Sequence, residues 1–241
     1  MAKMMTKTAF TVGLLVLLMA VPALGASVNK SVKIEAGGES SGASSVNGSI
    51  TIGENARVTG DAETVNGSIR IDSGASVQDA STVNGGVSLA KGVQADNLST
   101  VNGSIKLAEL VTVAGEVETV NGRINVEKGS TVANSVSNVN GKIALTGAEI
   151  GGDVSTVSGD IDVVDGSVVK GDIIVEKPSN WGFGKSKSRK PRIVIGPGSS
   201  VKGNIELEHK VDLFISETAE VGGVTGVMSL DDAVRFSGDS P

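Results

Sequence analysis

Few side chains in this chain of 241 residues could perform acid–base, nucleophilic or metal chemistry. Cysteine is absent, and the single histidine, His209, lies between two charged residues, where we expect a surface group and not a general base. The closest carboxylate pairs are Asp160 with Asp162, expected to face outward on a strand, and Asp231 with Asp232, expected in a terminal turn. With no cluster typical of a metal or phosphate site, the sequence predicts no catalytic residue, no metal and no cofactor, and therefore no enzyme.

The residues that recur are instead those of one short phrase, T-V-N-G, with S-V-N-G and N-V-N-G as variants. Its asparagines follow one another every 18 or 19 residues, and Ser158 takes the next place. Inside each unit, apolar residues also recur every six residues, as at Ile71, Val77 and Val83, with glycine or small polar residues between them. The asparagine column is Asn29, Asn47, Asn66, Asn84, Asn102, Asn121 and Asn140.

Three sides of six residues make one coil of 18, and a nineteenth residue fits at a corner. Apolar residues two apart, such as Ile69 and Ile71, form one side of a short strand, because side chains alternate between the two faces. The sequence therefore predicts an all-β fold, a three-sided parallel β-solenoid of about ten 18–19-residue coils, with a length of about 50 Å. It leaves the handedness of the solenoid open.

In the phrase T-V-N-G we expect the valine to point inward, the threonine and asparagine to point outward, and the glycine to turn the corner. Asn and Gly tolerate a positive φ, and stacked amides can bond to one another as a ladder. This interpretation makes the asparagines structural. The alternative is that the stripe of Thr64, Thr82, Thr100 and Thr119 with its asparagines meets a repeating surface such as ice or a polysaccharide.

The composition and the N-terminus both bear on where the protein works. Residues 1–26 have the pattern of a secretory signal peptide, with Lys3 and Lys7 before an apolar stretch that ends in small residues. We expect an exported protein, periplasmic or at the cell surface or extracellular, that folds without disulfides. Residues 27–228 are expected to form a single solenoid domain and residues 229–241 a C-terminal cap or tail.

One segment, residues 177–192, interrupts the repeat and is predicted to be an inserted loop. It carries six basic residues and no acid, and the net charge is −6 for the chain, hence −8 without Lys3 and Lys7 and −14 when the loop is also left out. The loop could bind an anionic partner, namely lipid headgroups, lipopolysaccharide, a polysaccharide or the acidic flank of another copy, or it could rest on its own acidic body. No nucleic acid partner is expected. The candidate binding residues are Trp181, Phe183, Lys185, Lys187, Arg189, Lys190 and Arg192.

Residues 156–175, TVSGDIDVVDGSVVKGDIIV, and 193–207, IVIGPGSSVKGNIEL, resemble the bactofilins, which are polymer-forming bacterial cytoskeletal proteins. The TVNGSI phrases are similar to those of secreted-adhesin-type repeat β-helix proteins. The bactofilin resemblance implies a β-helix that polymerises end to end without nucleotide and scaffolds envelope enzymes, and no catalytic residue transfers from either family. The chain departs from bactofilins in its signal peptide and its inserted loop.

Two functions follow as expectations. The first is a structural, scaffolding or adhesive rod of the bacterial cell envelope, which self-associates through an uncapped N-terminal coil at Val28–Ile34. The second is an envelope-binding module that captures an anionic component or membrane surface through the loop from Trp181 to Arg192. The C-terminal end is expected to be closed by Phe214, Met228 and Phe236.

Overall fold

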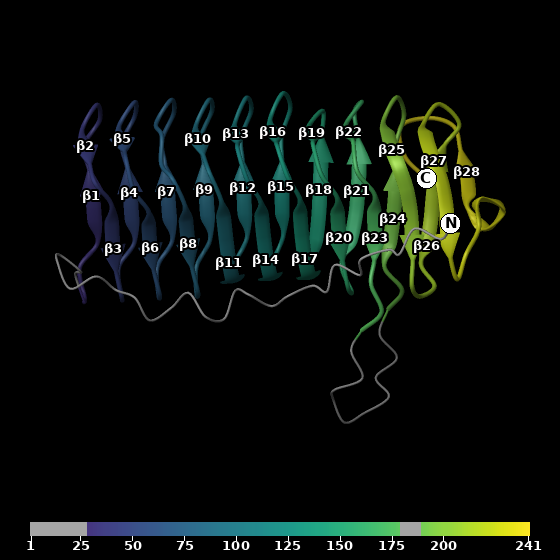
Figure 1. Cartoon of the computed structure of the whole chain (residues 1–241), viewed down its shortest axis with the longest axis horizontal. Helices are drawn as coiled ribbons and strands as arrows, with labels where there is room; N and C mark the ends of the chain where they lie inside the picture. The colour runs from purple at the N-terminus through teal and green to yellow at the C-terminus, as the bar shows by residue number, and fades with distance from the viewer. Residues whose placement is uncertain (1–27, 179–188) are drawn as a thin grey trace, which may run out of the picture.

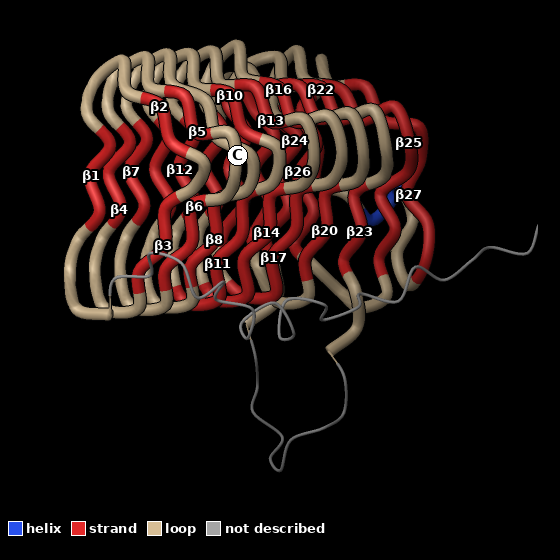
Figure 2. The backbone as a smooth tube through the Cα atoms, turned by 60° about the vertical axis from the view of Figure 1, so that its left-hand side comes forward, coloured by secondary structure: helices blue, strands red, loops and turns tan. Residues whose placement is uncertain are grey.

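The computed structural model describes residues 28–178 and 189–241, and it shows the predicted fold. The chain is a parallel β-solenoid of about ten turns, in which each coil stacks on the one before it (Figure 1). Strands of one side follow one another in a row along the rod, as the tube view makes plain (Figure 2). The predicted signal peptide and the loop residues Trp181, Phe183, Lys185 and Lys187 lie outside the described residues.

Each side of the solenoid is a parallel sheet that we number by its first strand. Side one holds β1 (Val32–Ile34), β4 (Ile50–Ile52), β7 (Ile69–Ile71), β9 (Val87–Leu89), β12 (Ile105–Leu107), β15 (Ile124–Val126), β18 (Lys142–Thr146), β21 (Asp160–Val164), β24 (Arg192–Ile195), β26 (Asp212–Ser216) and β28 (Val234–Phe236). Side two holds β2 (Glu39–Ser40), β5 (Arg57–Val58), β10 (Gln94–Ala95), β13 (Thr112–Val113), β16 (Thr131–Val132), β19 (Glu149–Ile150) and β22 (Val168–Val169).

Side three holds β3 (Ala43–Ser45), β6 (Ala62–Thr64), β8 (Ala80–Thr82), β11 (Leu98–Asn102), β14 (Val117–Asn121), β17 (Val136–Asn140), β20 (Val154–Thr156) and β23 (Ile173–Val175). Near the C-terminus the corner between sides two and three straightens. There β25 (Ser200–Leu207) pairs with both β22 and β23, and β27 (Glu220–Gly226) pairs with β25.

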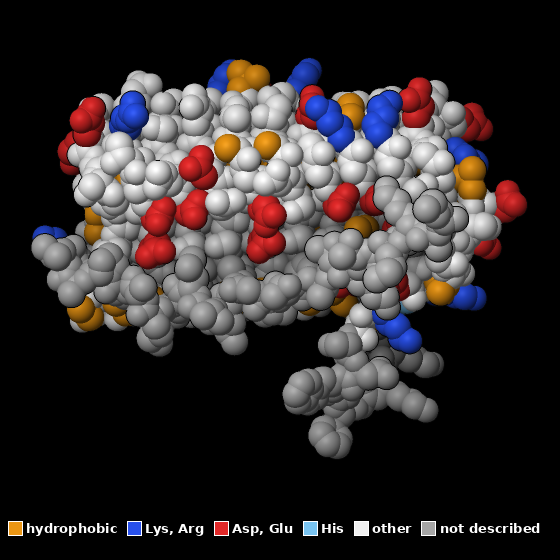
Figure 3. All heavy atoms as spheres, viewed as in Figure 1, with side chains coloured by type: hydrophobic (Ala, Val, Ile, Leu, Met, Phe, Trp, Pro, Cys, Tyr) orange, Lys and Arg blue, Asp and Glu red, His pale blue; other side chains and the backbone are white. Residues whose placement is uncertain are grey.

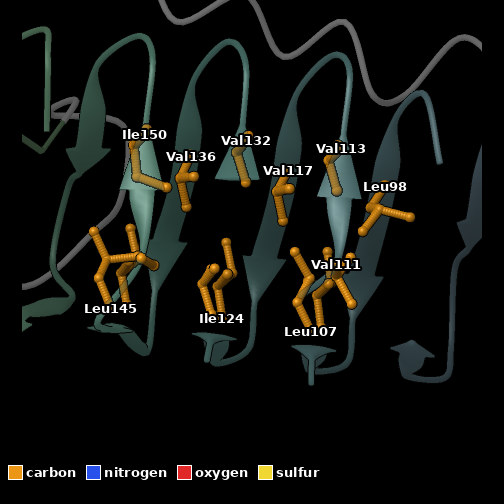
Figure 4. Close-up of a cluster of buried hydrophobic side chains, with 14 of the residues drawn as sticks. Leu98, Leu107, Val111, Val113, Val117, Ile124, Val132, Val136, Leu145 and Ile150 are labelled. Carbon is orange, nitrogen blue, oxygen red and sulfur yellow. The ribbon is translucent and has the colours of Figure 1, made fainter. Parts of the chain in front are cut away.

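The strands alternate buried and solvent-facing side chains because successive residues point to opposite faces. In β12, Ile105 and Leu107 are buried while Lys106 between them is exposed. The inward side chains of successive coils stack on one another, and Figure 4 shows them filling the space between the sides. This interior is narrow, which explains why the chain builds its core from Val, Ile, Leu and Ala with few aromatics.

Which residue faces inward on side three differs from the prediction. Val65 and Val83 are only half-buried, whereas Thr64 and Thr82, one position earlier, are buried inside the coil. Of the apolar residues spaced six apart, Ile71 and Val77 are buried on sides one and two, and only the valine of the phrase, such as Val83, lies half-exposed at the corner. The expectation of an inward valine and an outward threonine was wrong.

The turn between sides one and two needs a left-handed residue in most coils. Gly74 and Gly92 supply it with φ of 69° and 71°, and Asn55 does so with φ 55°. Leu110 occupies the same place with φ 59°, although a leucine adopts this conformation at a cost, and its side chain is 53% exposed.

The inserted loop leaves the rod at the corner between sides three and one, between β23 and β24. Ile161 pairs with Ile193 and Val169 pairs with Val201, so the solenoid resumes in register after 32 residues. This is the corner at which the earlier coils carry the T-V-N-G phrase or a variant of it, TVSG in the last coil before the loop. Described residues at both ends of the loop are therefore part of the solenoid edge.

The C-terminal end is covered by residues 227–236. A short 3-10 helix, Leu230–Asp232, follows β27, and β28 adds the last strand of side one, beyond the expected domain boundary at 228. Met228 packs against the core, as expected of a cap. Phe214 does not cap the core: it is on the outer face of β26, where the Arg192 guanidinium lies 5.1 Å from its ring centre.

Candidate functional site

The structure brings the seven asparagines of the repeat into one continuous ladder along the corner between sides three and one. Each amide Nδ2 donates a hydrogen bond to the Oδ1 of the asparagine one coil earlier. The ladder begins with Asn47 to Asn29 at 2.8 Å and ends with Asn140 to Asn121 at 3.0 Å. The four intermediate bonds are 2.8 to 3.1 Å long, and all seven side chains are exposed.

Beneath the ladder, the threonine of each phrase makes a second, buried row of hydrogen bonds. Thr100 Oγ1 donates to the carbonyl oxygen of Gly85 at 2.8 Å, and Thr64, Thr82 and Thr119 repeat the contact with a glycine one coil earlier. The hydroxyl thus binds a backbone carbonyl that the corner leaves inside the coil. Because these threonines are buried, the predicted exposed stripe of threonines for ice or polysaccharide does not exist.

The glycine of each phrase is required by close stacking and not, in most coils, by a positive φ. A Cβ on Gly103 would lie 1.7 Å from the carbonyl oxygen of Gly85, and one on Gly85 would lie 1.9 Å from that of Gly67. Of this glycine column only Gly141, with φ 126°, has a positive φ. The conformational reason predicted from the sequence was therefore wrong for most of the column, and the steric one replaces it.

A second ladder, which the sequence reasoning missed, runs along the corner between sides two and three. Here the side-chain oxygen of an Asp or Asn accepts a hydrogen bond from the backbone N–H one coil later. Asp79 receives the N–H of Asn97 at 3.1 Å, and Asp172 receives that of Asn204 at 2.7 Å. The available signal was an Asp or Asn directly before the first apolar residue of each side-three strand, as at Asp61, Asp79, Asn97, Asp153 and Asp172.

This second ladder contributes to an acidic surface on side three. Burial, together with the charges of Asp61 and Asp79, raises the pKa of Glu63 above its usual range. Burial and the neighbouring Glu116 do the same to the pKa of Glu118. The face of the rod drawn in Figure 3 accordingly carries a band of acidic side chains along its length.

The described end of the inserted loop is tied to the body of the rod by charge. Arg189 forms an ion pair with Asp160, whose other oxygen accepts the backbone N–H of Arg192 at 2.8 Å. Asp162 faces Arg192 at 3.9 Å and also pairs with Lys142. Lys190 is 3.8 Å from Asp212, so three of the seven candidate binding residues face carboxylates of their own chain.

These contacts match the expectation that the loop rests on its own acidic body, for Arg189, Lys190 and Arg192. They also give Asp160 and Asp162 a structural use: both side chains are 19% exposed and lie among cations. The binding interpretation depends on Trp181, Phe183, Lys185 and Lys187, which lie outside the described residues.

His209 takes the position of the asparagine ladder in the coil that follows the loop. Its Nε2 lies 3.0 Å from the carbonyl oxygen of Val157, and the ring is half-buried. This contact bridges the two coils that flank the insertion. In the described part of the chain, no group of three or more His, Cys, Asp or Glu side chains is placed to hold a metal ion.

The grooves on the rod are open and shallow. One lies on side two between Arg57, Gln94 and Asp96, and another on side one between Arg70 and Lys106. Neither brings a histidine to its carboxylates among the described residues.

Comparison with known proteins adds no relative. A scan against protein-family models, a search of curated proteins and a search of solved structures each returned no match to this chain. Among the described residues, no helix has the length and apolar character needed to span a membrane.

Proposed function

We propose that this chain is an exported, non-enzymatic rod with a structural, scaffolding or adhesive role in the bacterial cell envelope, and that it self-associates through its N-terminal coil. The observation that carries the proposal is the difference between the two ends of the described solenoid. At both ends the outermost strands, β1, β2 and β3 at one and β27 and β28 at the other, are paired along one edge only in the described structure, but at the C-terminal end Met228 and Ala233 also pack against the core. Unpaired strand edges invite pairing with another chain.

The strands of the N-terminal edge are short and carry Lys33 and Glu39, which limit such pairing, but their backbone is available for it. These strands contain no proline, and β1 pairs with β4 in unbroken register from Val32 to Ile34. The Val32 N–H and the Ile34 carbonyl bond to the next coil, so the N–H and carbonyl of Lys33 point to the open edge. An edge-to-edge contact between two such coils would use backbone hydrogen bonds and would therefore resist salt.

The resemblance to bactofilins and to adhesin-type repeat β-helices supports the same proposal. The resemblance is carried by short phrases of low specificity, such as TVSGDI. Export rests on the signal-peptide pattern of residues 1–26. Fractionation of cells that produce a tagged protein tests it: the chain is expected in the periplasm or on the cell surface, and retention in the cytoplasm would contradict the proposal.

The end contact is tested by removing one backbone donor. Lys33→Pro deletes the N–H that points to the open edge and leaves the bonds of Val32 and Ile34 to β4 in place. Lys33→Ser is the matched control, because it removes the same charged side chain and keeps the N–H. In sedimentation velocity at about 500 mM salt, where charge contacts are screened, Lys33→Ser should retain the end-on species and Lys33→Pro should lose it. Equal behaviour of the two variants would reject the N-terminal contact.

A further inference from the structure

Side three presents a surface with acids and no bases over seven successive coils. From β6 to β23, neither the strands nor the residue before each of them includes a lysine or arginine. The acids point outward, or lie at the corner where side three begins. They are Asp61, Glu63, Asp79, Glu116, Glu118, Asp153 and Asp172.

Side one carries a row of cations over its N-terminal part, bordered by acids at its corner with side two. From β1 to β18, the strands and the residue before each include five cations and no acid, while Glu35, Asp72 and Glu127 directly follow β1, β7 and β15. Lys33 and Lys142 form ion pairs with Glu35 and Asp162. The remaining three are exposed and form no ion pair within the described residues, and we call them the cationic row: Arg70, Lys106 and Arg123.

The two sets of charges recur at the same intervals along the rod. In the cationic row, β12 lies two coils after β7, and β15 lies one coil after β12. On side three, β20 lies two coils after β14, and β23 lies one coil after β20. Glu118 is in β14, and Asp153 and Asp172 directly precede β20 and β23. In the reverse direction, β14, β8 and β6 repeat the intervals with Glu118, Asp79 and Glu63. Since all coils are about 4.8 Å apart, three cations can face three acids in either direction.

We propose that two copies of this rod associate side by side, with the cationic row on side one of one copy against the acidic side three of the other. Seven coils of about 4.8 Å by a side about 17 Å wide give about 570 Å² per copy, so about 1,140 Å² in total, above the roughly 1,000 Å² that a specific interface needs. The interface is heterologous, because each copy offers both surfaces, so further copies can add. This lateral contact adds a second mode of self-association to the proposed scaffold, and it rests on that proposal in treating the rod as self-associating.

The test exchanges the charges of the two surfaces. One variant carries Arg70→Glu, Lys106→Glu and Arg123→Glu, and both of its surfaces are then acidic. The other carries Glu63→Lys, Glu116→Lys and Glu118→Lys, so that its side three has three lysines against four remaining aspartates and loses its strong negative charge; Asp61, Asp79, Asp153 and Asp172 are left in place because they accept ladder hydrogen bonds. All chains start at Ser27, which retains every described residue, and carry Lys33→Pro so that end pairing does not contribute.

At about 20 mM salt the chain with natural charges should associate in sedimentation velocity, and each variant alone should sediment as a monomer. An equimolar mixture of the two variants should associate again, because the unchanged acidic side three of the first variant can meet the unchanged cationic row of the second. Association of either variant alone, or a mixture that stays monomeric while both keep a native β circular-dichroism spectrum, would overturn the proposal. Deleting residues 179–188 checks the inserted loop: loss of association there, without recovery in the mixture, would assign the contact to the loop. Failure of this lateral contact leaves the Lys33 result unaffected.

Discussion

At the scale of single residues, three residues of the T-V-N-G phrase have separate structural roles. The asparagine bonds to its counterparts on the surface, the threonine bonds to a glycine carbonyl inside, and the glycine lets the coils approach. Each role needs the residue type that the repeat preserves. The phrase therefore holds shape, and this answers why it recurs in so many coils.

Gly103→Ala tests the steric role of the glycine. A Cβ there would lie 1.7 Å from the Gly85 carbonyl, so the coils must separate, and we expect a loss of more than about 3 kcal/mol in the free energy of unfolding. Gly92→Ala is the control: its Cβ would meet nothing within 4 Å, and φ of 71° should cost about 1–2 kcal/mol. Denaturant unfolding of both variants decides, and a larger loss in Gly92→Ala would contradict the steric explanation.

The asparagine ladder has a direction, which aspartate substitutions can reveal. Asn140 only donates within the ladder, to Asn121, so Asn140→Asp places a carboxylate against an amide oxygen and should cost about 1 kcal/mol near neutral pH. Protonation below about pH 4 should recover most of it. Asn29 only accepts, from Asn47, so Asn29→Asp should be nearly neutral. Thermal unfolding across pH measures both, and equal losses at neutral pH would refute the assigned donor direction.

The sequence could predict the ladder because seven identical residues at one spacing must stack in a solenoid. It could not predict that threonine is buried while valine is half-exposed. Hydrophobicity alone places Val83 inside and Thr82 outside, but the corner leaves a carbonyl, that of Gly67, to which the Thr82 hydroxyl donates and a valine could not. In a later coil the Asn138 amide donates to the carbonyl of Gly122 in the same way. A local hydrogen bond therefore reverses the preference at this column.

At the scale of elements, the turns and sides of each coil are nearly equivalent, so their exceptions are informative. Leu110 is one such exception, because it adopts the left-handed conformation at a turn where Asn55 or a glycine stands in other coils. The spacing of the repeat located this turn, but no pattern in the sequence indicated why a leucine stands there.

Leu110→Asn should stabilise the chain by about 0.5–1 kcal/mol, because asparagine tolerates φ near 59° and the exposed apolar side chain is removed. Asn55→Leu is the reciprocal control and should destabilise it by a similar amount. Thermal unfolding of the pair is the measurement. A destabilised Leu110→Asn would show that the leucine makes a favourable contact that outweighs the backbone cost.

On side three, the raised pKa of Glu118 predicts a pH-dependent gain on removing its charge. Its folded-state pKa lies above the ordinary 4.5, so the ionised form opposes folding at neutral pH, and the penalty is relieved as pH falls below the folded-state value. Glu118→Gln should stabilise the chain near pH 7 by less than about 1 kcal/mol, since the group is half-exposed, and this gain should vanish below about pH 4.5. Glu54→Gln, on an exposed turn, is the control. A gain that persists at low pH would contradict the electrostatic cause.

At the scale of the whole molecule, the coil length, the number of coils and the place of the insertion all followed from the spacing of the phrase. The separation of charge onto two sides did not, because it depends on which column faces outward. Arg70 and Glu63 are close in sequence and lie on different sides of the rod. Only the folded coil distributes these charges into one acidic and one cationic surface.

The end contact and the lateral contact differ in their response to salt, so one measurement tests the central claim that this rod self-associates. Sedimentation velocity of the chain from Ser27, at about 20 mM and about 500 mM salt, separates backbone pairing from charge pairing. The account predicts an end-on species that persists at high salt and heavier species that form only at low salt. A monomer under both conditions would contradict the scaffold role and the lateral interface together.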